Sequence, residues 1–281
     1  MIDFLGDFAE DSEFSKLLGR RDDEVDLTRA ALELARDAYP NLSFDPVLNW
    51  VAERAGELSG PIARASGDEA ILRALTDCLA GRFEITGSPE AYETPDGSYL
   101  NRVIETRTGI PICLAVLYLA VADKAGIGLR GVCAPGHFLT RYDTLHKPFF
   151  IDAYHGGRIL TLAECIERLV TEHDLTKPQA RKALEGTGPR PIVARMLNNL
   201  KAITAKVENW KLCWKVQHRL LALNPSAYSE RRDWALVSLK AGRPGPALTM
   251  LEQCLKNCPE EERAILREHA NKAKGAVSAF N

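Results

Sequence analysis

The run from Pro111 to Ala125 constrains the fold of this chain more than any other stretch. Pro111 has the fixed φ that suits the first turn of a helix, and the residues after it are apolar on nearly every face of that helix. Because such a helix has no side that favours water, the sequence predicts a central, buried helix on which other elements pack.

Cys113 lies in the first turn of this predicted helix. Unpaired backbone N–H groups and the positive end of the helix dipole favour an anion there, so the position predicts a thiol with a lowered pKa. A cysteine that only fills space in a buried helix is the alternative interpretation.

The apolar period changes along the rest of the chain. Helical spacing predicts helices in three segments of the N-terminal third: 26–40, 45–59 and 68–79. Gly60 and Pro61 fall beyond the predicted end of the second helix, and turn residues between Thr86 and Gly97 predict a surface connection. Convincing strand-like runs occur in one region only: 129–134, 137–142 and 148–152.

Helical spacing returns at Thr161 and is interrupted by Gly186–Pro191, which we interpret as the boundary between two units. The order of elements predicts an α+β fold. Its parts are a helical N-terminal part, a core domain over residues 26–185 with a small antiparallel sheet, and an all-helical region over residues 191–281.

Residues 1–25 are acidic. The first twenty-six residues carry nine acidic and three basic side chains, with phenylalanine and leucine residues between them. This pattern predicts a loosely attached helical arm whose charges form a solvated face.

The region from residue 191 onward contains an internal repeat. Leu223-Asn224-Pro225 and Asn257-Cys258-Pro259 end two apolar helices thirty-four residues apart, which is the tetratricopeptide period. Lys240-Ala241-Gly242 supplies the turn in the better copy, whereas Glu208 replaces the glycine in the other. We predict two degenerate tetratricopeptide repeats and a capping helix from Glu260 to Ala279, which either support the main domain or bind a peptide.

The β-prone region predicts one specific contact. If its hairpin turns through residues 143–146, Tyr142 pairs with Lys147. Counting outward in this register places His137 directly opposite Asp152, with Cβ atoms about 4.5–5.5 Å apart. A slip of one residue would turn Asp152 to the other face.

Cys113, His137 and Asp152 could then fill the three roles of a thiol-nucleophile site. The cysteine needs a base for its proton, and the imidazole needs an acceptor that fixes its tautomer and stabilises the imidazolium. Such a site attacks an amide or ester carbonyl and passes through a thioester. Backbone N–H groups at the helix start, including that of Cys113, are candidate oxyanion donors, with Asn101 as a further candidate and His155 on the pocket rim.

Metal binding is the competing interpretation of the same region. Five residues of metal-ligand type lie within twenty-three positions: Cys133, His137, His146, Asp152 and His155. No spacing among them matches a known ligand motif, so we predict neither a metal nor another cofactor.

Composition argues against several classes of function. A formal charge of -2 gives no positive field for nucleic acid. The sequence has no window of eighteen apolar residues and no signal-like start, which predicts no membrane association. Seven scattered cysteines without a C-x-x-C pair argue against a disulfide framework or a zinc knuckle. We therefore expect a cytoplasmic protein, and its oligomeric state stays open.

Several strings of residues resemble a known family. They are Asn101-Arg102-Val103, Gly109-Ile110-Pro111-Ile112-Cys113-Leu114, Pro135-Gly136-His137-Phe138 and Ile151-Asp152. In this order they are similar to the bacterial SirB-type family of the transglutaminase-like superfamily, whose core is papain-like and is joined to C-terminal tetratricopeptide repeats. The resemblance covers residues 45–259 and implies Cys113 as nucleophile, His137 as base and Asp152 as its orienting partner. Family members often carry serine at the position of Cys113.

Two functions follow as hypotheses. The first is cysteine-dependent acyl transfer or amide hydrolysis on a protein or peptide, which the helical repeats present. The second is a non-catalytic interaction scaffold, or pseudoenzyme, that binds partners through its tetratricopeptide region.

Overall fold

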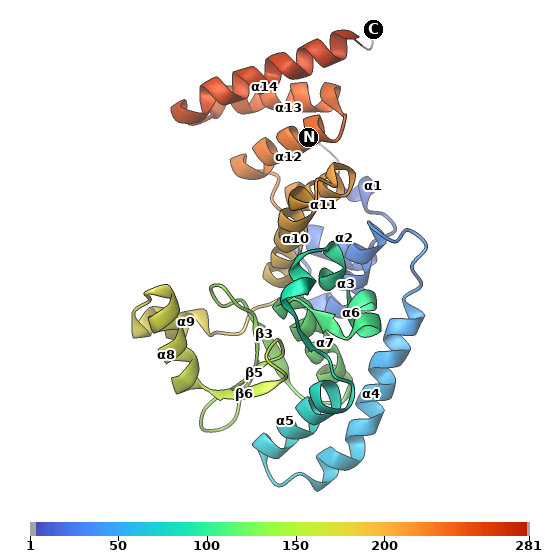
Figure 1. Ribbon diagram of the computed structural model, residues 1–281, viewed down its shortest axis with the longest axis vertical. Helices are drawn as coiled ribbons and strands as arrows, with labels where there is room; N and C mark the ends of the chain where they lie inside the picture. Colours follow the sequence, from blue (N-terminus) through green and yellow to red (C-terminus); the bar gives the residue numbers. More distant parts are fainter. Residues whose placement is uncertain (1–3, 280–281) are drawn as a thin grey trace. The chain divides into compact units, whose positions relative to one another are not determined.

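The structure is a computed structural model that describes residues 4–279 as a mostly helical α+β protein (Figure 1). The described residues form two compact units. The first is Phe8–Met196, and the second joins the described residues up to Asp7 to those from Leu197 onward. Among the helices in this described range, none is long and apolar enough to cross a membrane.

The helices of the first unit are α2 (Ser12–Leu18), α3 (Leu27–Arg36), α4 (Asp45–Arg64), α5 (Asp68–Thr76), α6 (Leu100–Thr106), α7 (Pro111–Lys124), α8 (Leu162–His173) and α9 (Lys177–Ala183). Short turns of 3-10 or π type are η1 (Asp22–Glu24), η2 (Asp77–Arg82), η3 (Pro89–Tyr92) and η4 (Pro95–Ser98). The strands are β1 (Thr86–Gly87), β2 (Thr108–Gly109), β3 (Leu129–Val132), β4 (Leu139–Tyr142), β5 (Phe149–Asp152) and β6 (Arg158–Thr161). The second unit contains α1 (Phe4–Asp7), α11 (Trp210–Leu223), α12 (Tyr228–Lys240), α13 (Pro244–Asn257) and α14 (Glu260–Ala279), and α10 (Pro189–Lys206) has residues in both units.

The helix α7 is the buried core of the first unit, as the sequence predicts. Its residues from Pro111 to Tyr118 are all buried, and it packs against α3, α4 and α6 and against strands β3 and β4. Helices and strands together thus cover the apolar surface of α7 on all sides. This packing fixes the position of Cys113 relative to the sheet.

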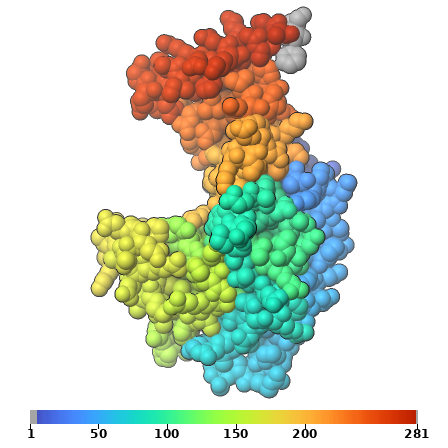
Figure 2. Space-filling model, viewed as in Figure 1, coloured from blue at the N-terminus to red at the C-terminus, as the bar shows by residue number. Residues whose placement is uncertain are grey.

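The main sheet is antiparallel, with strand order β3-β4-β5-β6. Its strands β3 and β4 contact α7, whereas α8 and α9 join Val132, Phe150 and Leu160 of the sheet in a separate apolar cluster. Figure 2 shows the α8–α9 segment (yellow) at the surface beside the strand segment (yellow-green). The strand β6 adds to the three strands that the sequence predicted.

The register of the β4–β5 hairpin differs from the predicted one by two residues. Tyr142 pairs with Phe149 rather than with Lys147, and His137 precedes β4 instead of lying in it. The turn is longer than predicted because the hydroxyl of Thr144 bonds to backbone groups two and three residues further along the chain. A shift of two residues keeps alternate side chains on the same face, so β5 presents the predicted face.

The N-terminal segment is helical, as predicted, but it is not loosely attached. Phe14 and Leu17 of α2 are buried. The carboxylate of Glu33 on α3 accepts hydrogen bonds from the backbone N–H groups of Glu13 and Phe14, 2.9 and 2.8 Å long. These N–H groups have no partner within their own helix, so Glu33 caps α2 and fastens it to α3.

Two boundaries in the first unit also differ from the prediction. The helix α4 continues through Gly60 and Pro61 to Arg64, beyond its last buried residue, Leu58, and against the local break signal. Residues 86–97 are more than a surface connection: β1 pairs in parallel with β2, and Gly97 is buried and accepts a hydrogen bond from the Ile110 N–H.

The second unit stacks α11, α12, α13 and α14 in chain order. The predicted helix ends at Leu223 and Asn257 are confirmed, as is the final helix Glu260–Ala279. Gly242 makes the predicted turn with φ of 74°, and Glu208 takes φ of 55° at the turn before α11. Glu208 thus adopts the left-handed conformation that a glycine would adopt without strain.

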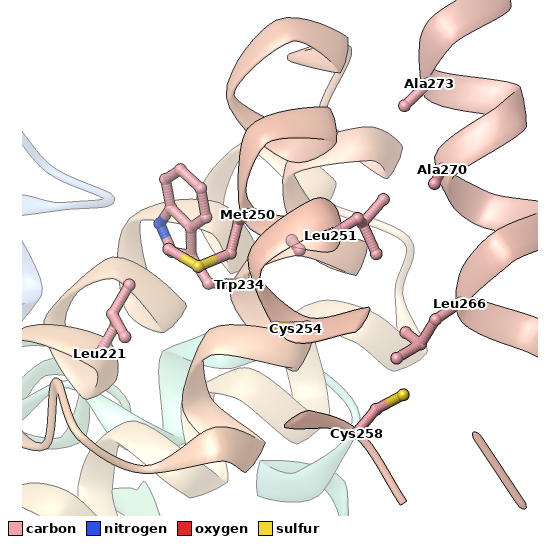
Figure 3. Packing of buried hydrophobic residues seen from close by; sticks show 10 residues of the cluster. Leu221, Trp234, Met250, Leu251, Cys254, Cys258, Leu266, Ala270 and Ala273 are labelled. Atoms are coloured by element: carbon pink, nitrogen blue, oxygen red, sulfur yellow. The ribbon is translucent and has the colours of Figure 1, made fainter. Parts of the chain in front are cut away.

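One apolar cluster holds these helices together. It contains Trp234 of α12, Leu251 of α13 and Leu266 of α14, and its small residues Ala270 and Ala273 let α14 approach closely (Figure 3). A single helix pair could not cover this surface alone, which is why the repeats stack.

Candidate thiol site

The carboxylate of Asp152 is the centre of the candidate site. It lies at the end of β5 and is 1% exposed, so its oxygens depend on partners within the protein. Oδ1 is 2.8 Å from Nε2 of His137, and Oδ2 is 2.8 Å from Nδ1 of His155. The Arg168 guanidinium donates to Oδ2 at 3.3 Å. The structure therefore brings together three of the residues singled out in the sequence.

These partners set the pKa of Asp152. Burial by itself raises the pKa of this carboxyl, but the hydrogen bonds and charges of His137 and His155 outweigh burial and hold the pKa at about 2, against an ordinary 3.8. Asp152 is therefore ionised at neutral pH. A carboxylate in this state orients an imidazole and stabilises the imidazolium.

A tight turn positions His137 in front of β4. Gly136 has φ of 67°, and a side chain there would run into the ring of His173. Arg195 steadies the turn by donating hydrogen bonds to the carbonyl oxygens of Ala134 and His137. Because Nε2 is engaged by the carboxylate, Nδ1 is the ring nitrogen left to take a proton from a nucleophile.

The turn after β5 places two more rings beside His137. The Tyr154 ring stands edge-on to the His137 ring, with centroids 6.1 Å apart, and the His155 ring centroid is 5.6 Å away. Tyr154 occupies the space where a side chain at Gly87 would lie. His155 is 50% exposed, so the cluster around the buried carboxylate reaches solvent at this residue.

A pocket of about 390 Å³ opens at this exposed end. Its lining is mostly charged and mixed in sign: Asp152, His155, Arg158, Leu160, Glu164, Arg168 and Glu172. Such walls suit a polar group that both donates and accepts hydrogen bonds.

Cys113 occupies the predicted place in α7 but not the predicted chemical state. Its side chain is 0% exposed, and this burial raises the pKa of the thiol above its ordinary 9.0, with no charged partner to offset the shift. The prediction of a lowered pKa is wrong because loss of hydration penalises the thiolate more than the helix start favours it. No hydrogen bond joins this thiol to His137 within the described residues.

The predicted oxyanion donors also need correction. The N–H of Cys113 already donates to the Ile110 carbonyl at 3.1 Å, so it is not free for an oxyanion. On α6, the side-chain oxygen of Asn101 is buried and has no hydrogen-bond partner in the part of the chain that is described. The hydroxyl of Tyr99 is in the same state. Burial, together with the nearby negative charges of Asp37 and Asp96, raises the pKa of Tyr99, so its hydroxyl keeps a proton to donate.

Three residues around the site have no motif that points to them: Tyr99, Tyr154 and Arg168. Arg168 reaches Asp152 only because α8 packs against β5 and β6. The one usable signal is the position of Tyr154, two residues after Asp152 in the same turn as His155.

The six cysteines other than Cys113 lie outside the candidate site. All seven are free, and all except Cys133 are buried. Cys165 of α8 lies in the apolar cluster between the sheet and α8.

Comparisons with known proteins give the following matches. The family model described as transglutaminase-like superfamily matches residues 45–198, and a tetratricopeptide repeat model matches residues 200–273. A UPF0162 protein of Xylella fastidiosa is 32% identical over 252 residues, which cover 88% of this chain and 90% of that protein. A UPF0162 protein of Vibrio cholerae is 21% identical over 258 residues, covering 87% and 90%. F-box only protein 21 of Mus musculus is 30% identical over 188 residues, covering 64% of this chain and 27% of that protein. No solved structure gives a significant match.

Proposed function

Since the chain belongs to the transglutaminase-like superfamily, we propose that it transfers or hydrolyses acyl groups of a protein or peptide through the thiol of Cys113. One observation carries this proposal: the ionised, buried carboxylate of Asp152 lies 2.8 Å from Nε2 of His137. An imidazole oriented in this way is ready to act as a general base through its other nitrogen.

In the proposed reaction, His137 takes the thiol proton at Nδ1 while the sulfur of Cys113 attacks an amide carbonyl carbon. The C–N bond breaks, the imidazolium gives its proton to the leaving amine, and a thioester remains on the sulfur. Water or a second amine then attacks the thioester carbon while His137 takes the proton of that nucleophile. The C–S bond breaks, the acid or new amide leaves, and the imidazolium returns its proton to the sulfur of Cys113. Asp152 stabilises the imidazolium in both halves, and Tyr99 and Asn101 are the proposed oxyanion donors.

The protonation state of the Cys113 thiol decides whether it reacts as a preformed thiolate or only after His137 removes its proton. Because burial raises the pKa of Cys113, the resting thiol is protonated. The attack therefore depends on proton removal by His137 and not on a preformed thiolate pair.

A thiol-reactive acyl probe tests the proposal. Cys165 is a matched internal control, because it is also a buried thiol in a helix of the first unit. We expect mass spectrometry of the folded protein to show faster acylation of Cys113 than of Cys165. Loss of the base in His137→Gln should slow the Cys113 reaction by about 10²–10⁴-fold. The proposal is contradicted if both cysteines are labelled equally slowly and if Cys113→Ala keeps the full acyl-transfer or hydrolysis activity of the wild type.

The sealed position of Cys113 supports a second candidate function, a non-catalytic interaction protein that binds a protein or peptide through its tetratricopeptide repeats. In this alternative the papain-like core is a pseudoenzyme. For either function we propose a cytoplasmic location, because a reducing compartment keeps cysteines free.

Pull-down experiments separate the two candidates. The bait proteins are the full chain, its Cys113→Ala variant, and a fragment that begins with α10 at Pro189 and is first checked for helical content by circular dichroism. Partners retained by the fragment and by Cys113→Ala support the scaffold. Partners that need the full chain with its thiol count against it.

A further inference from the structure

The arrangement of His137, Asp152 and His155 carries an inference beyond the proposed function. We propose that these three residues bind a divalent transition metal ion, with Zn²⁺ as the best match to their donor atoms. Zinc accepts imidazole nitrogens and carboxylate oxygens, and a water in the fourth position completes a tetrahedral site. The expectation of no metal rested on spacing along the chain, which does not reveal that His155 joins His137 on the same carboxylate.

The distances between the donor atoms favour this assignment. One nitrogen from each ring and one carboxylate oxygen all lie within 4.8 Å of one another, and no other such set occurs among the described residues. Each nitrogen already points at an oxygen of the same carboxylate, at 2.8 Å. Zinc bonds of about 2.0–2.2 Å place tetrahedral ligand atoms about 3.4 Å apart, which lies within the spacing of this set.

The surroundings of the cluster also suit a metal. Asp152 is buried and held in place, whereas His155 is 50% exposed and gives the ion an entry path and a water-facing position. Arg168 hydrogen-bonds the Asp152 carboxylate, as partners of metal-binding carboxylates commonly do. The positive charge of Arg168 is balanced in turn by Glu172, 3.0 Å away.

Metal binding changes the proton positions in the site. A proton that Nε2 of His137 shares with Asp152 has to leave before this nitrogen can bind the ion, and a neutral ring then carries its proton on Nδ1. Nδ1 is the position that the proposed reaction uses as base. The metal-bound protein is therefore unable to take a proton from Cys113, and the ion acts as an inhibitor of the thiol reaction.

Zinc titration of the full-length protein in competition with a chromogenic chelator measures the site directly. We expect one site per chain, and Co²⁺ in its place should give the visible absorption of a tetrahedral complex. Removal of a residue that only hydrogen-bonds a metal ligand weakens metal affinity about 10- to 100-fold. His155 is a proposed ligand itself, so His155→Gln should lower the affinity for zinc by at least this factor. His146→Gln is the matched control, because this exposed histidine lies in the β4–β5 turn outside the cluster.

Each outcome bears on the proposal. A wild-type protein that binds zinc no more tightly than His155→Gln overturns it, and so does an equal loss in His146→Gln. His155 is half exposed, so its replacement leaves the fold intact. Asp152→Asn is a second variant, and circular dichroism first shows whether it is folded. Cys113→Ser should bind zinc like the wild type, and a loss there contradicts the ligand set. A protein that binds zinc, but whose Cys113 stays unreactive after a chelator has removed the zinc, contradicts the proposed function alone.

Discussion

His218 is a largely buried histidine, with 13% of its side chain exposed, and its charge depends on its neighbours. Trp234 donates its indole N–H to Nδ1 at 3.2 Å, and Nε2 lies 2.8 Å from Asp7. Burial lowers the pKa of His218, Asp7 opposes the shift, and Arg219 and Arg243 add to it. The fold therefore stabilises the neutral ring, because a proton on Nδ1 would break the bond from Trp234.

We expect the free energy of unfolding to decrease as the pH falls below the ordinary histidine pKa of 6.5. The unfolded chain binds a proton there while folded His218 still resists it, so stability is lost between 6.5 and the lower folded pKa. Urea unfolding followed by tryptophan fluorescence measures the effect. His218→Gln should show a weaker pH dependence, and the exposed His146→Gln should behave as the wild type. A slope unchanged in His218→Gln contradicts the assignment.

Gly87 offers a test of the packing behind the site. A methyl group there would lie inside the Tyr154 ring, so Gly87→Ala must displace the ring that flanks His137. Overpacking of this kind costs about 1–3 kcal/mol. Gly56→Ala is the matched control, because Gly56 is exposed in the middle of α4 with open space around it, and alanine there should stabilise by about 0.5–1 kcal/mol. Chemical denaturation of both variants gives the comparison.

At the residue scale, the contact between His137 and Asp152 could be predicted, but the state of Cys113 could not. The contact follows from chain proximity across one hairpin, and it tolerates a two-residue error in register. The pKa of Cys113 depends on how completely α3, α4, α6 and the sheet close around α7, which no local pattern shows.

At the element scale, α8 depends on a local signal at its start. Thr161 accepts a hydrogen bond from the Glu164 N–H, and the Glu164 carboxylate accepts one from the Thr161 N–H at 2.7 Å. This reciprocal capping box satisfies two backbone donors that the helix leaves unpaired. Because α8 carries Arg168, its first turn also supports the Asp152 cluster.

Removal of this cap should loosen α8. We expect Thr161→Ala to lower the free energy of unfolding by about 0.5–2 kcal/mol and to speed hydrogen exchange at the start of the helix. Thr171→Ala, in the last turns of the same helix with an exposed side chain, should leave both unchanged. Equal exchange in both variants would contradict a role for the cap.

Elements with local signals were predicted well, and those without were not. The predicted start of α3 at Asp26 and the predicted turn at Gly242 are confirmed, and Asp26 caps α3. The strands β1 and β2 are two residues long, too short for any period, and the β4–β5 register depends on a side-chain hydroxyl in the turn. The helix α4 runs past Pro61 beyond its last buried residue, Leu58, so the proline is a break signal that this helix does not obey.

At the scale of the whole molecule, each unit has its own apolar core, so a core substitution should act within its unit. Leu266 is 1% exposed in the cluster of the second unit, and Leu266→Ala should cost about 2–5 kcal/mol and speed hydrogen exchange from α11 to α14. Ile265→Ala is the control on the adjacent residue, which is 57% exposed, and should change stability by less than about 0.5 kcal/mol. Hydrogen exchange that rises equally across Phe8–Met196 contradicts separate cores.

The α+β order and the stacked repeats were predictable because a change of apolar period and a fixed repeat length survive in sequence. The attachment of the N-terminal helices was not. Charge counts suggested a solvated arm. The carboxylate of Glu33, which lies on α3 outside this arm, instead binds the backbone N–H groups at the start of α2 and holds α2 against α3.

The burial of the cysteines links folding to oxidation. While the chain is folded, Cys133 alone among the seven is not buried. Unfolding of either unit releases the buried thiols of that unit, and in an oxidising solution these thiols can form disulfides within and between chains faster than the unit refolds. The lifetime of the protein outside a reducing medium is then governed by how often it opens, a rate, and not by its equilibrium stability.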